Sequence, residues 1–428
     1  MEISQVYELF KKHPVVTTDS RNCPEGSLFF ALKGDKFNGN SYALSALEKG
    51  SSYAVVDEAE YAVNDRIILV DDVLDTLQKL ANYHRKKLKT PIIGITGTNG
   101  KTTTKELVAA VLSEEFNVTF TQGNLNNHIG VPLTLLKLAP ENEVAVVEMG
   151  ANHVGEIKIL AEIAEPNFGL ITNIGRAHLE GFGSFENIIK TKTELYDFIR
   201  NKKNAKAFVD VDNPILMQQS EGMTIVTYGS NPDAFIHGKI ISNNPFLEFE
   251  WVFLDKSHRV QTQLIGEYNF SNVMAAIAVG KYLGVTVEAI NRALQNYIPT
   301  NNRSQLKKTE RNTLIVDAYN ANPTSMAAAL KNFEHIKVSR KGVILGDMLE
   351  LGNESVEEHL KIIDEVEKAL YDKVFFVGKE FKKLNRNGQA FDTVEELAEY
   401  LKKDPISGYT MLVKGSHGMH LEKAVECL

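Results

Sequence analysis

The sequence predicts an α/β protein built from three domains. Its 428 residues are enough for about three domains of ordinary size when length serves as a soft prior. Strand-like and helix-like runs alternate along the middle of the chain, and the same alternation restarts near residue 301. This alternation is typical of parallel sheets that are covered by helices. We therefore expect domains over residues 1–88, 89–300 and 301–428.

The first range is expected to form a small α/β domain. Short strand-like pieces occupy Ser27 to Leu32, Tyr53 to Val56 and Ile67 to Val70, together with two helix-like stretches. The basic run that begins at Arg85 is followed by Pro91, which makes a domain boundary within this run reasonable. We interpret the run as a solvated helix face rather than a binding patch.

The central range is expected to form a parallel sheet. Its expected strands are Ile92–Thr96, Val144–Met149 and Phe168–Ile174, and its helices include Lys101–Phe116, Glu156–Ala164 and Phe185–Ile199. The nearly continuous apolar character of the second strand fits burial on both faces. From Ala234 to Ile265 polar and apolar residues alternate instead, which predicts a small antiparallel β insertion. A helix over Phe270–Leu283 then leads to the second boundary.

The third range is expected to form a smaller, Rossmann-like α/β domain. Its expected strands are Leu314–Asp317, Val343–Leu345, Val374–Val377 and Met411–Val413. Helix-like runs separate these strands, as in the central range. Three domains around interdomain clefts favour an enzyme with several substrates.

The stretch GITGTNGKTTT, from Gly94 to Thr104, joins an expected strand to an expected helix. A glycine-rich turn at this place points backbone N–H groups at a phosphate. Lys101 would add a charge for the β and γ oxygens, and Thr102 could hold Mg²⁺. The usual first glycine of this pattern would stand at Ile95, and Gly97 supplies a glycine instead. We infer a nucleoside triphosphate site; the alternative is a tight turn with a solvated lysine.

Glu148 lies at the end of the second expected strand, and His178 lies just beyond the third. Ligands of open α/β sheets bind outside the carboxyl ends of the strands. Glu148 could ligate Mg²⁺ beside Thr102, or it could cap a helix. His178 taken alone would be an ordinary polar loop residue, but it shares this sheet edge with Lys101.

Lys192 lies within the apolar stripe of its expected helix, four residues after Ile188, whereas Lys190 faces away. An inward lysine is costly unless it is paired, neutralised or chemically altered. The alternative is a side chain that snorkels to the helix surface.

Polar side chains near the second boundary are further candidates. The run DAYNANP from Asp317 to Pro323 suits ligand contacts or a turn with an Asn cap. Asn269 and Asn272 share one face at a helix start, where Asn272 could bind a base and Asn269 could cap the helix. Arg303 could reach a phosphate when the domains close.

Composition excludes several classes of protein. A net charge of −8 and a pI near 5.8 argue against a nucleic-acid binder. Cys23 and Cys427 stand far apart and form no metal-binding spacing, as expected for reduced thiols in the cytoplasm. We expect no signal peptide and no membrane span, because residues 1–13 lack an apolar core and no run approaches ~20 apolar residues.

These motifs together resemble those of the Mur ligases. Besides the phosphate loop, the resemblance rests on GNLNNHIGVP from Gly123, AHLEGFGS from Ala177, DAYNANP from Asp317 and GDMLELG from Gly346. The set is similar to the member that adds D-alanyl-D-alanine to UDP-N-acetylmuramoyl-tripeptide. No D-N-P-R-type segment of the member that adds the third residue is present. The stretches Asp19–Arg21 and Phe30–Gly34 resemble the uridine-nucleotide region of the family.

The resemblance implies a role for each candidate. ATP would be bound by Gly97, Thr98, Asn99, Gly100, Lys101, Thr102, Thr103, Asn269, Asn272, Arg303 and Asp317. Mg²⁺, as two ions, would be served by Thr102, Glu148 and His178, and Lys192 would be modified by CO₂ to a carbamate. The implied catalytic set is Lys101, Glu148, His178 and Lys192. The substrates would be contacted by Ser20, Arg21, Lys33, Asn126, Asn127, Asn320 and Asn322.

The implied reaction is an ATP-driven amide ligation through an acyl phosphate, which gives the pentapeptide precursor of peptidoglycan. The N-terminal domain would bind the UDP substrate, and the C-terminal domain would close over ATP and bind the dipeptide; the protein would act as a monomer. Two positions depart from the family pattern, Asn40 where histidine is frequent and His417 where arginine is usual. The alternatives are a folylpolyglutamate-type ligase and a phosphate-loop NTPase switch or scaffold.

Overall fold

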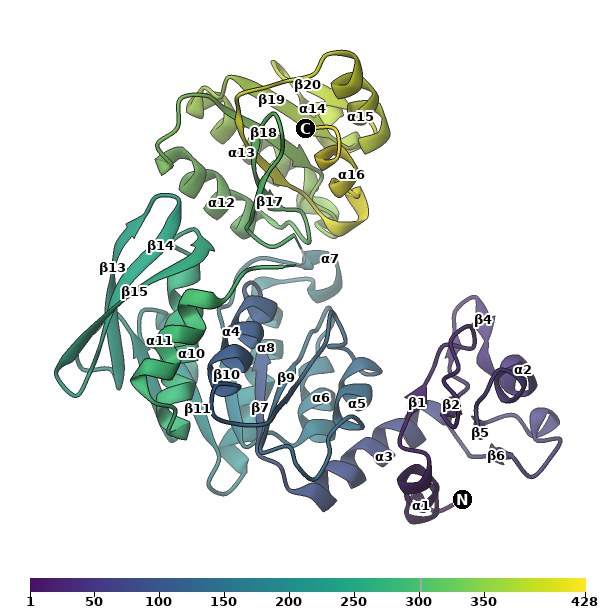
Figure 1. Cartoon of the computed structure of the whole chain (residues 1–428). Helices are drawn as coiled ribbons and strands as arrows, with labels where there is room; N and C mark the ends of the chain where they lie inside the picture. The colour runs from purple at the N-terminus through teal and green to yellow at the C-terminus, as the bar shows by residue number, and fades with distance from the viewer. Residues whose placement is uncertain (301) are drawn as a thin grey trace.

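The computed structural model, which describes residues 1–300 and 302–428, confirms the three-domain α/β class (Figure 1). Sheets of four, nine and six strands follow one another along the chain, and each lies within one of the three predicted ranges. The boundaries at residues 88 and 300 stay predictions, and residue 301, the first of the third range, lies outside the described residues.

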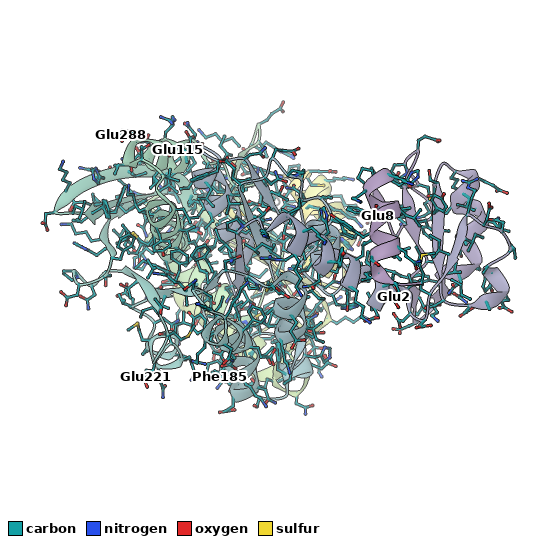
Figure 2. The ribbon with its side chains drawn as sticks, turned by 90° about the horizontal axis from the view of Figure 1, so that it is seen from below. Glu2, Glu8, Glu115, Phe185, Glu221 and Glu288 are labelled. Atoms are coloured by element: carbon teal, nitrogen blue, oxygen red, sulfur yellow. The ribbon has the colours of Figure 1, made fainter. Side chains whose placement is uncertain are left out.

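The N-terminal sheet is parallel, in the order β1-β2-β5-β6. Its elements are α1 (Ile3–Lys12), β1 (Val16–Thr17), β2 (Leu28–Phe30), β3 (Lys33–Gly34), β4 (Phe37–Asn38), α2 (Ala43–Glu48), β5 (Tyr53–Val56), β6 (Ile67–Leu69) and α3 (Val73–Leu88). This domain stands to one side of the others, and α3 leads from it into the central domain (Figure 1). Figure 2 shows Glu2 and Glu8, at α1, at the opposite end of the molecule from Glu115 and Glu288.

Arg85, in the last turn of α3, corrects the interpretation of the basic run as a solvated face. Its side chain is buried, and Nε donates a hydrogen bond of 2.8 Å to the carbonyl oxygen of Ala164. The neighbouring Lys86, Lys87 and Lys89 are exposed, as predicted. Arg85 therefore fastens α3 to the central domain, a tertiary contact that local composition does not reveal.

The central sheet has the order β15-β14-β13-β12-β11-β10-β7-β9-β8. Its elements are β7 (Ile92–Thr96), α4 (Lys101–Leu112), β8 (Val118–Phe120), α5 (Gly130–Leu135), β9 (Val144–Glu148), α6 (Glu156–Ala164), β10 (Phe168–Ile171), α7 (Leu179–Phe182), α8 (Phe185–Asn201), β11 (Lys206–Asp210), α9 (Pro214–Gln219), β12 (Ile225–Gly229), β13 (Ile236–Asn243), β14 (Phe246–Phe253), β15 (Lys256–Ile265), α10 (Asn269–Leu283) and α11 (Val287–Asn296). The predicted antiparallel segment is a three-stranded meander, β13 to β15, and it extends the main sheet because β13 pairs with β12 in parallel.

The C-terminal sheet has the order β16-β17-β21-β18-β19-β20 and is parallel except for its first pair. Its elements are β16 (Gln305–Lys308), β17 (Thr313–Asp317), α12 (Pro323–His335), β18 (Lys341–Gly346), α13 (Ser355–Ala369), β19 (Lys373–Val377), α14 (Lys379–Leu384), β20 (Gln389–Phe391), α15 (Val394–Lys403), β21 (Thr410–Lys414) and α16 (Glu422–Val425). This domain lies above the ends of β7 and β10 in Figure 1.

Candidate active site

A cavity of about 860 Å³ lies between the central and C-terminal domains. The loops after β7, β9 and β10 line it from the central domain, as expected for the carboxyl edge of a parallel sheet. The predicted residues that line it are Thr98, Asn99, Gly100, Lys101, Thr102, Thr103, Asn126, Asn127, Glu148, His178, Asn269, Asn272, Arg303, Asp317 and Asn320. Residues far apart in the sequence therefore meet at one site.

The glycine-rich loop joins β7 to α4, and its two glycines explain the unusual spacing. Gly97 has a φ of +141°, and a Cβ atom there would lie 2.1 Å from the hydroxyl oxygen of Thr172 on the neighbouring chain segment. Gly100 has a φ of +76° and lies against the amide of Asn272. Ile95, where the common pattern has its first glycine, is fully buried within β7. Only glycine fits positions 97 and 100 in this loop.

Lys101 begins α4 and folds back over the loop. Its Nζ donates hydrogen bonds of 2.9 Å to the carbonyl oxygens of Gly97 and Thr98. Burial lowers the pKa of Lys101 to about 8, although the nearby Glu148 opposes this shift. The ammonium therefore has few charged partners in the protein itself and is suited to meet an anion.

We expect nucleotide affinity to weaken as the pH rises above about 8. In the free protein Lys101 loses its proton there, whereas a bound phosphate favours the protonated form. The dissociation constant for ATP should then rise by up to about tenfold per pH unit. Calorimetric titration across this range would measure it. The Lys101→Arg variant, which stays charged, should lose this dependence, and an unchanged slope in that variant would contradict the assignment to Lys101.

Glu148, the last residue of β9, is 1% exposed and faces the phosphate loop. Its Oε1 accepts hydrogen bonds from Thr102 Oγ1 at 3.2 Å and from Asn126 Nδ2 at 2.9 Å, whereas its Oε2 is buried without a partner. A buried carboxylate oxygen that is left unpaired costs free energy unless a ligand meets it. With the Thr102 hydroxyl it forms a small set of hard oxygen donors, which suits Mg²⁺. Helix capping, the alternative for Glu148, is not what its contacts show.

His178 lies in the loop after β10 with a φ of +52°, a conformation that non-glycine residues rarely adopt. Its Nδ1 contacts Oε2 of Glu350, which belongs to the C-terminal domain. The same loop and Glu350 also meet through a backbone hydrogen bond from Glu180 N to Glu350 O. Among residues 1–300 and 302–428, no cluster of three or more His, Cys, Asp and Glu is arranged to hold a metal ion. His178 thus links two domains here, and its predicted metal role stays a prediction.

Lys192 is buried in α8, with 2% of its surface exposed, as its position in the apolar stripe predicts. Its Nζ donates to the carbonyl oxygen of Ala151 at 3.2 Å and lies 5.3 Å from the centre of the Phe182 ring. Burial, followed by the charge of Lys101, lowers its pKa well below the ordinary value. The snorkelling alternative is therefore wrong, and the amine contacts the backbone of Ala151, a residue that lines the cavity.

The first turn of α10 supports the phosphate loop. Asn272 accepts a hydrogen bond of 3.0 Å at its Oδ1 from Thr104 Oγ1, and its Nδ2 donates one of 2.9 Å to Asn269 Oδ1. Asn269 in turn donates to the carbonyl oxygen of Ile265, so it does not cap the helix. Both amides are buried and fixed before any ligand arrives.

Arg303 lies where the chain enters the C-terminal domain. Its guanidinium lies 3.7 Å from the centre of the Tyr319 ring, and its Nε is buried without a hydrogen-bond partner among the residues that the structure describes. His417, the position at which the resemblance leads us to expect arginine, lies beside the same tyrosine. The ring centres of His417 and Tyr319 are 5.5 Å apart. Asp317 accepts a hydrogen bond of 2.6 Å from Lys414 Nζ. An unpartnered guanidinium nitrogen at this cavity suits an anionic ligand.

Asn320 and Asn322 follow β17 but have different environments. Asn320 is exposed and lines the cavity. Asn322 is the N-cap of α12, where its Oδ1 accepts a hydrogen bond from Ser325 N at 2.9 Å. Its Nδ2 donates to Asn99 Oδ1 at 2.8 Å, which ties α12 to the phosphate loop. The structure thus shows the Asn-cap alternative at Asn322, which is not among the cavity-lining residues.

The variant Asn322→Ala should lower the melting temperature, because loss of an Asn cap costs about 0.5–2 kcal/mol. Asn322→Ser should retain most of the stability, since a serine hydroxyl can still accept from Ser325 N. Thermal unfolding of the purified variants would test this. Equal losses in both variants would show that the bond to Asn99, rather than the cap, stabilises this region.

The predicted substrate residues of the N-terminal domain lie apart from this cavity. Arg21 pairs with Asp19, and Ser20 accepts a hydrogen bond at its carbonyl oxygen from Lys49 Nζ. Lys33 Nζ lies 3.0 Å from Asp57 Oδ1. Asn40, the other departure from the family pattern, is buried and donates to the same Asp57 oxygen at 2.9 Å. Lys33 and Asn40 thus meet at the buried Asp57 carboxylate, on a different domain from the phosphate loop.

Comparison with known proteins agrees with this architecture. Three domain models match the chain: Mur ligase family, catalytic domain, over residues 14–85; Mur ligase middle domain, over 95–280; and Mur ligase, glutamate ligase domain, over 302–417. A Bacillus subtilis (strain 168) protein named UDP-N-acetylmuramoyl-tripeptide–D-alanyl-D-alanine ligase is 35% identical over 427 residues, which cover 96% of this chain and 92% of that relative. The chain belongs to the Mur ligase family.

Solved Mur ligase structures share the whole fold. MurF from Acinetobacter baumannii superposes with a TM-score of 0.89 at 28% identity and covers 99% of this chain and 97% of its own. MurF from Thermotoga maritima, solved in complex with ADP, gives 0.87 at 27% identity, with 98% and 97% covered. A relative from Escherichia coli (strain K12), with the same name as the Bacillus protein, is 34% identical over 96% of this chain and 93% of its own length.

Three further residues of this Mur ligase site, Lys414, Glu350 and Tyr319, line the cavity from the C-terminal domain and were given no individual role from the sequence. Tyr319 and Glu350 lie within the runs DAYNANP and GDMLELG, which were the available signal for them. Lys414 is 2% exposed and lies at the carboxyl end of β21. A lysine at the end of an apolar strand was the sequence signal that could have identified it.

In the part of the chain that the structure describes, no helix combines the length and apolar character that membrane crossing requires.

Proposed function

We propose that this Mur ligase joins D-alanyl-D-alanine to UDP-N-acetylmuramoyl-tripeptide with cleavage of ATP to ADP and phosphate, giving the pentapeptide precursor of peptidoglycan. One observation supports this above others. A single cavity unites the phosphate loop and Glu148 of the central domain with Arg303, Asp317 and Asn320 of the C-terminal domain. Relatives with this activity in their names match over the whole chain.

In the first step, an oxygen of the terminal tripeptide carboxylate attacks the γ-phosphorus of ATP. The bond from that phosphorus to the β-γ bridging oxygen breaks, and ADP leaves while an acyl phosphate forms. Lys101 and the N-terminus of α4 offset charge on the transferring phosphoryl group. Arg303, with its free Nε, is placed to approach the same phosphates.

In the second step, the amine of D-alanyl-D-alanine attacks the acyl carbon, an amide bond forms, and inorganic phosphate leaves. The bond from the acyl carbon to the phosphate oxygen breaks, and the nitrogen gives up its proton to the departing phosphate. Water must be excluded from the acyl phosphate, because hydrolysis would waste it. We propose that the C-terminal domain closes over ATP for this reason and that Asn320 lies near the incoming dipeptide. Solution scattering should show a more compact particle with an ATP analogue and both substrates; identical profiles would contradict closure.

Mg²⁺ and a modified lysine belong to the same proposal. Thr102 and Glu148 would hold one Mg²⁺, which supplies positive charge beside the phosphates, and His178 would serve a second ion when its contact with Glu350 is released. Lys192 would react with CO₂ to form a carbamate, which is an anion suited to a site rich in cations. Its depressed pKa supports this, because only the neutral amine is nucleophilic toward CO₂.

The remaining assignments follow from the substrates. The N-terminal domain, with Ser20, Arg21 and Lys33, would bind the UDP moiety. Because ATP and a UDP-linked substrate are both cytoplasmic compounds, we propose that the protein acts in the cytoplasm. One chain contains all of the proposed site residues, so we propose that it acts as a monomer.

The decisive test is phosphate release from ATP with each substrate omitted in turn. Release should require both UDP-N-acetylmuramoyl-tripeptide and D-alanyl-D-alanine, and the product mass should increase by the dipeptide. Release that ignores both would favour an NTPase, and acceptance of folate with glutamate would favour a folylpolyglutamate-type ligase.

A further inference from the structure

A polar cluster that does not line the active-site cavity lies where β11 ends, with three buried members and the half-buried Ser271. Its members are Asp210 at the end of β11, Ser271 in the first turn of α10, Tyr196 on α8 and Tyr228 on β12. Both tyrosines are 0% exposed, and Asp210 is 7% exposed. Burying a carboxylate costs free energy unless hydrogen bonds or opposite charges compensate for the lost water.

Asp210 joins the strand end to α10. Ser271 Oγ donates a hydrogen bond to Asp210 Oδ2, and the backbone N–H of Asp212 donates to Oδ1 at 2.9 Å. Burial raises the pKa of Asp210, and these two donors oppose the shift. No cation lies within 4.0 Å of this carboxylate among the described residues, so the hydrogen bonds, rather than an ion pair, hold it.

Two buried tyrosines lie near the carboxylate. Among the described residues neither hydroxyl has a hydrogen-bond partner, and burial, followed by the charge of Asp210, raises the pKa of each. A phenol near a carboxylate stays protonated. The bond from the half-buried Ser271 to the buried Asp210 therefore lies in a largely buried environment, where a hydrogen bond is stronger than in water.

Ser271 is next in sequence to Asn272, whose amide accepts from Thr104 and packs against Gly100 of the phosphate loop. The start of α10 has no side-chain cap of its own. Without the bond to Asp210, the first turn of α10 would keep the side-chain bonds from Asn269 to Ile265, from Asn272 to Asn269 and from Thr104 to Asn272. The bond from Ser271 to Asp210 is therefore one of several contacts that together set the position of the Asn272 amide.

We propose that Asp210 is a positioning residue for the nucleotide site, acting through Ser271 on the first turn of α10 and so on the Asn272 amide that supports the phosphate loop. The proposal rests on the nucleotide site of the proposed function but not on the ligation itself. Asp210 would stabilise the conformation of the phosphate loop indirectly, without contacting a substrate.

The test is calorimetric titration of ADP into the full-length protein and its variants. Ser271→Ala removes the hydroxyl and should weaken ADP binding by about fivefold to tenfold, the equivalent of one hydrogen bond. Ser271→Thr keeps a hydroxyl and should restore affinity to within about threefold. Asp210→Asn should also weaken ADP binding. The double variant should bind ADP as tightly as the more impaired single variant, because the two side chains act through one hydrogen bond.

Thr262→Val is the matched control. Thr262 is a buried hydroxyl of β15 that donates to the carbonyl oxygen of Leu247 at 2.9 Å, away from the cavity lining. It should lower the melting temperature as Ser271→Ala does and leave ADP affinity unchanged. Equal loss of affinity in the control, or unchanged affinity in Ser271→Ala, would overturn the proposal. Since ADP binding needs no ligation, failure of the proposed activity would appear separately, in the substrate-omission assay.

Discussion

Replacing Lys192 with methionine is expected to abolish ligation while leaving the protein at least as stable as before. The amine is buried with a single carbonyl partner and with a pKa lowered well below its ordinary value, so the fold gains little from it. Methionine has a similar length and no charge to desolvate, and such replacements are often neutral or stabilising. Turnover should fall by about 10²–10³-fold or more, because the lost group acts on charge in the transition state. Kinetics and thermal unfolding on the same preparations would measure both effects.

Lys190→Met on the same helix is the control, because Lys190 is exposed. It should change neither turnover nor melting temperature appreciably. A carbon NMR spectrum of protein in ¹³C-bicarbonate should show a carbamate resonance in the wild type and in Lys190→Met but not in Lys192→Met. Full activity of Lys192→Met would contradict a role in the reaction, and a large loss of its stability would make Lys192 a structural residue.

The parts of this site that obey local rules could be predicted from the sequence. Helical periodicity placed Lys192 inward, and the order of strands placed Glu148 and His178 at one edge of a sheet. The strand and helix on either side of the phosphate loop were also predicted, with the strand at Ile92–Thr96. These predictions succeed because the period of the apolar residues and the end of a strand are both visible in a few neighbouring residues.

Contacts between distant segments could not be predicted in this way. The burial of Arg85 depends on carbonyl groups at the end of α6, and the contact of His178 with Glu350 depends on how two domains dock. Asn322 has a local role as a cap that composition allowed, but its bond to Asn99 arises only in the tertiary fold. Such pairings are set by packing of whole elements, which no local pattern encodes.

Glu148→Gln is expected to produce the second large loss of activity. Glutamine can keep an oxygen for the hydrogen bonds from Thr102 and Asn126 while it places an amide group where the unpartnered Oε2 now lies. That change removes a negative charge and a hard oxygen donor without changing the shape of the side chain. Turnover should fall by about 10²-fold or more, and the Mg²⁺ concentration that gives half-maximal rate should rise.

The stability of Glu148→Gln separates a role in binding a cation from a role in folding. A carboxylate that is 1% exposed with one unpaired oxygen destabilises the free protein, so its neutral isostere should melt at the same or a higher temperature. Glu143→Gln serves as control, since Glu143 is exposed just before β9 and accepts a hydrogen bond from Asn117 N at 2.9 Å. If Glu148→Gln melted earlier and showed an unchanged Mg²⁺ dependence, the carboxylate would be a support for the loop. We expect an equal or higher melting temperature together with a raised Mg²⁺ requirement. That result would mean that the protein tolerates an unpaired buried oxygen at Glu148 because a cation meets it during the reaction.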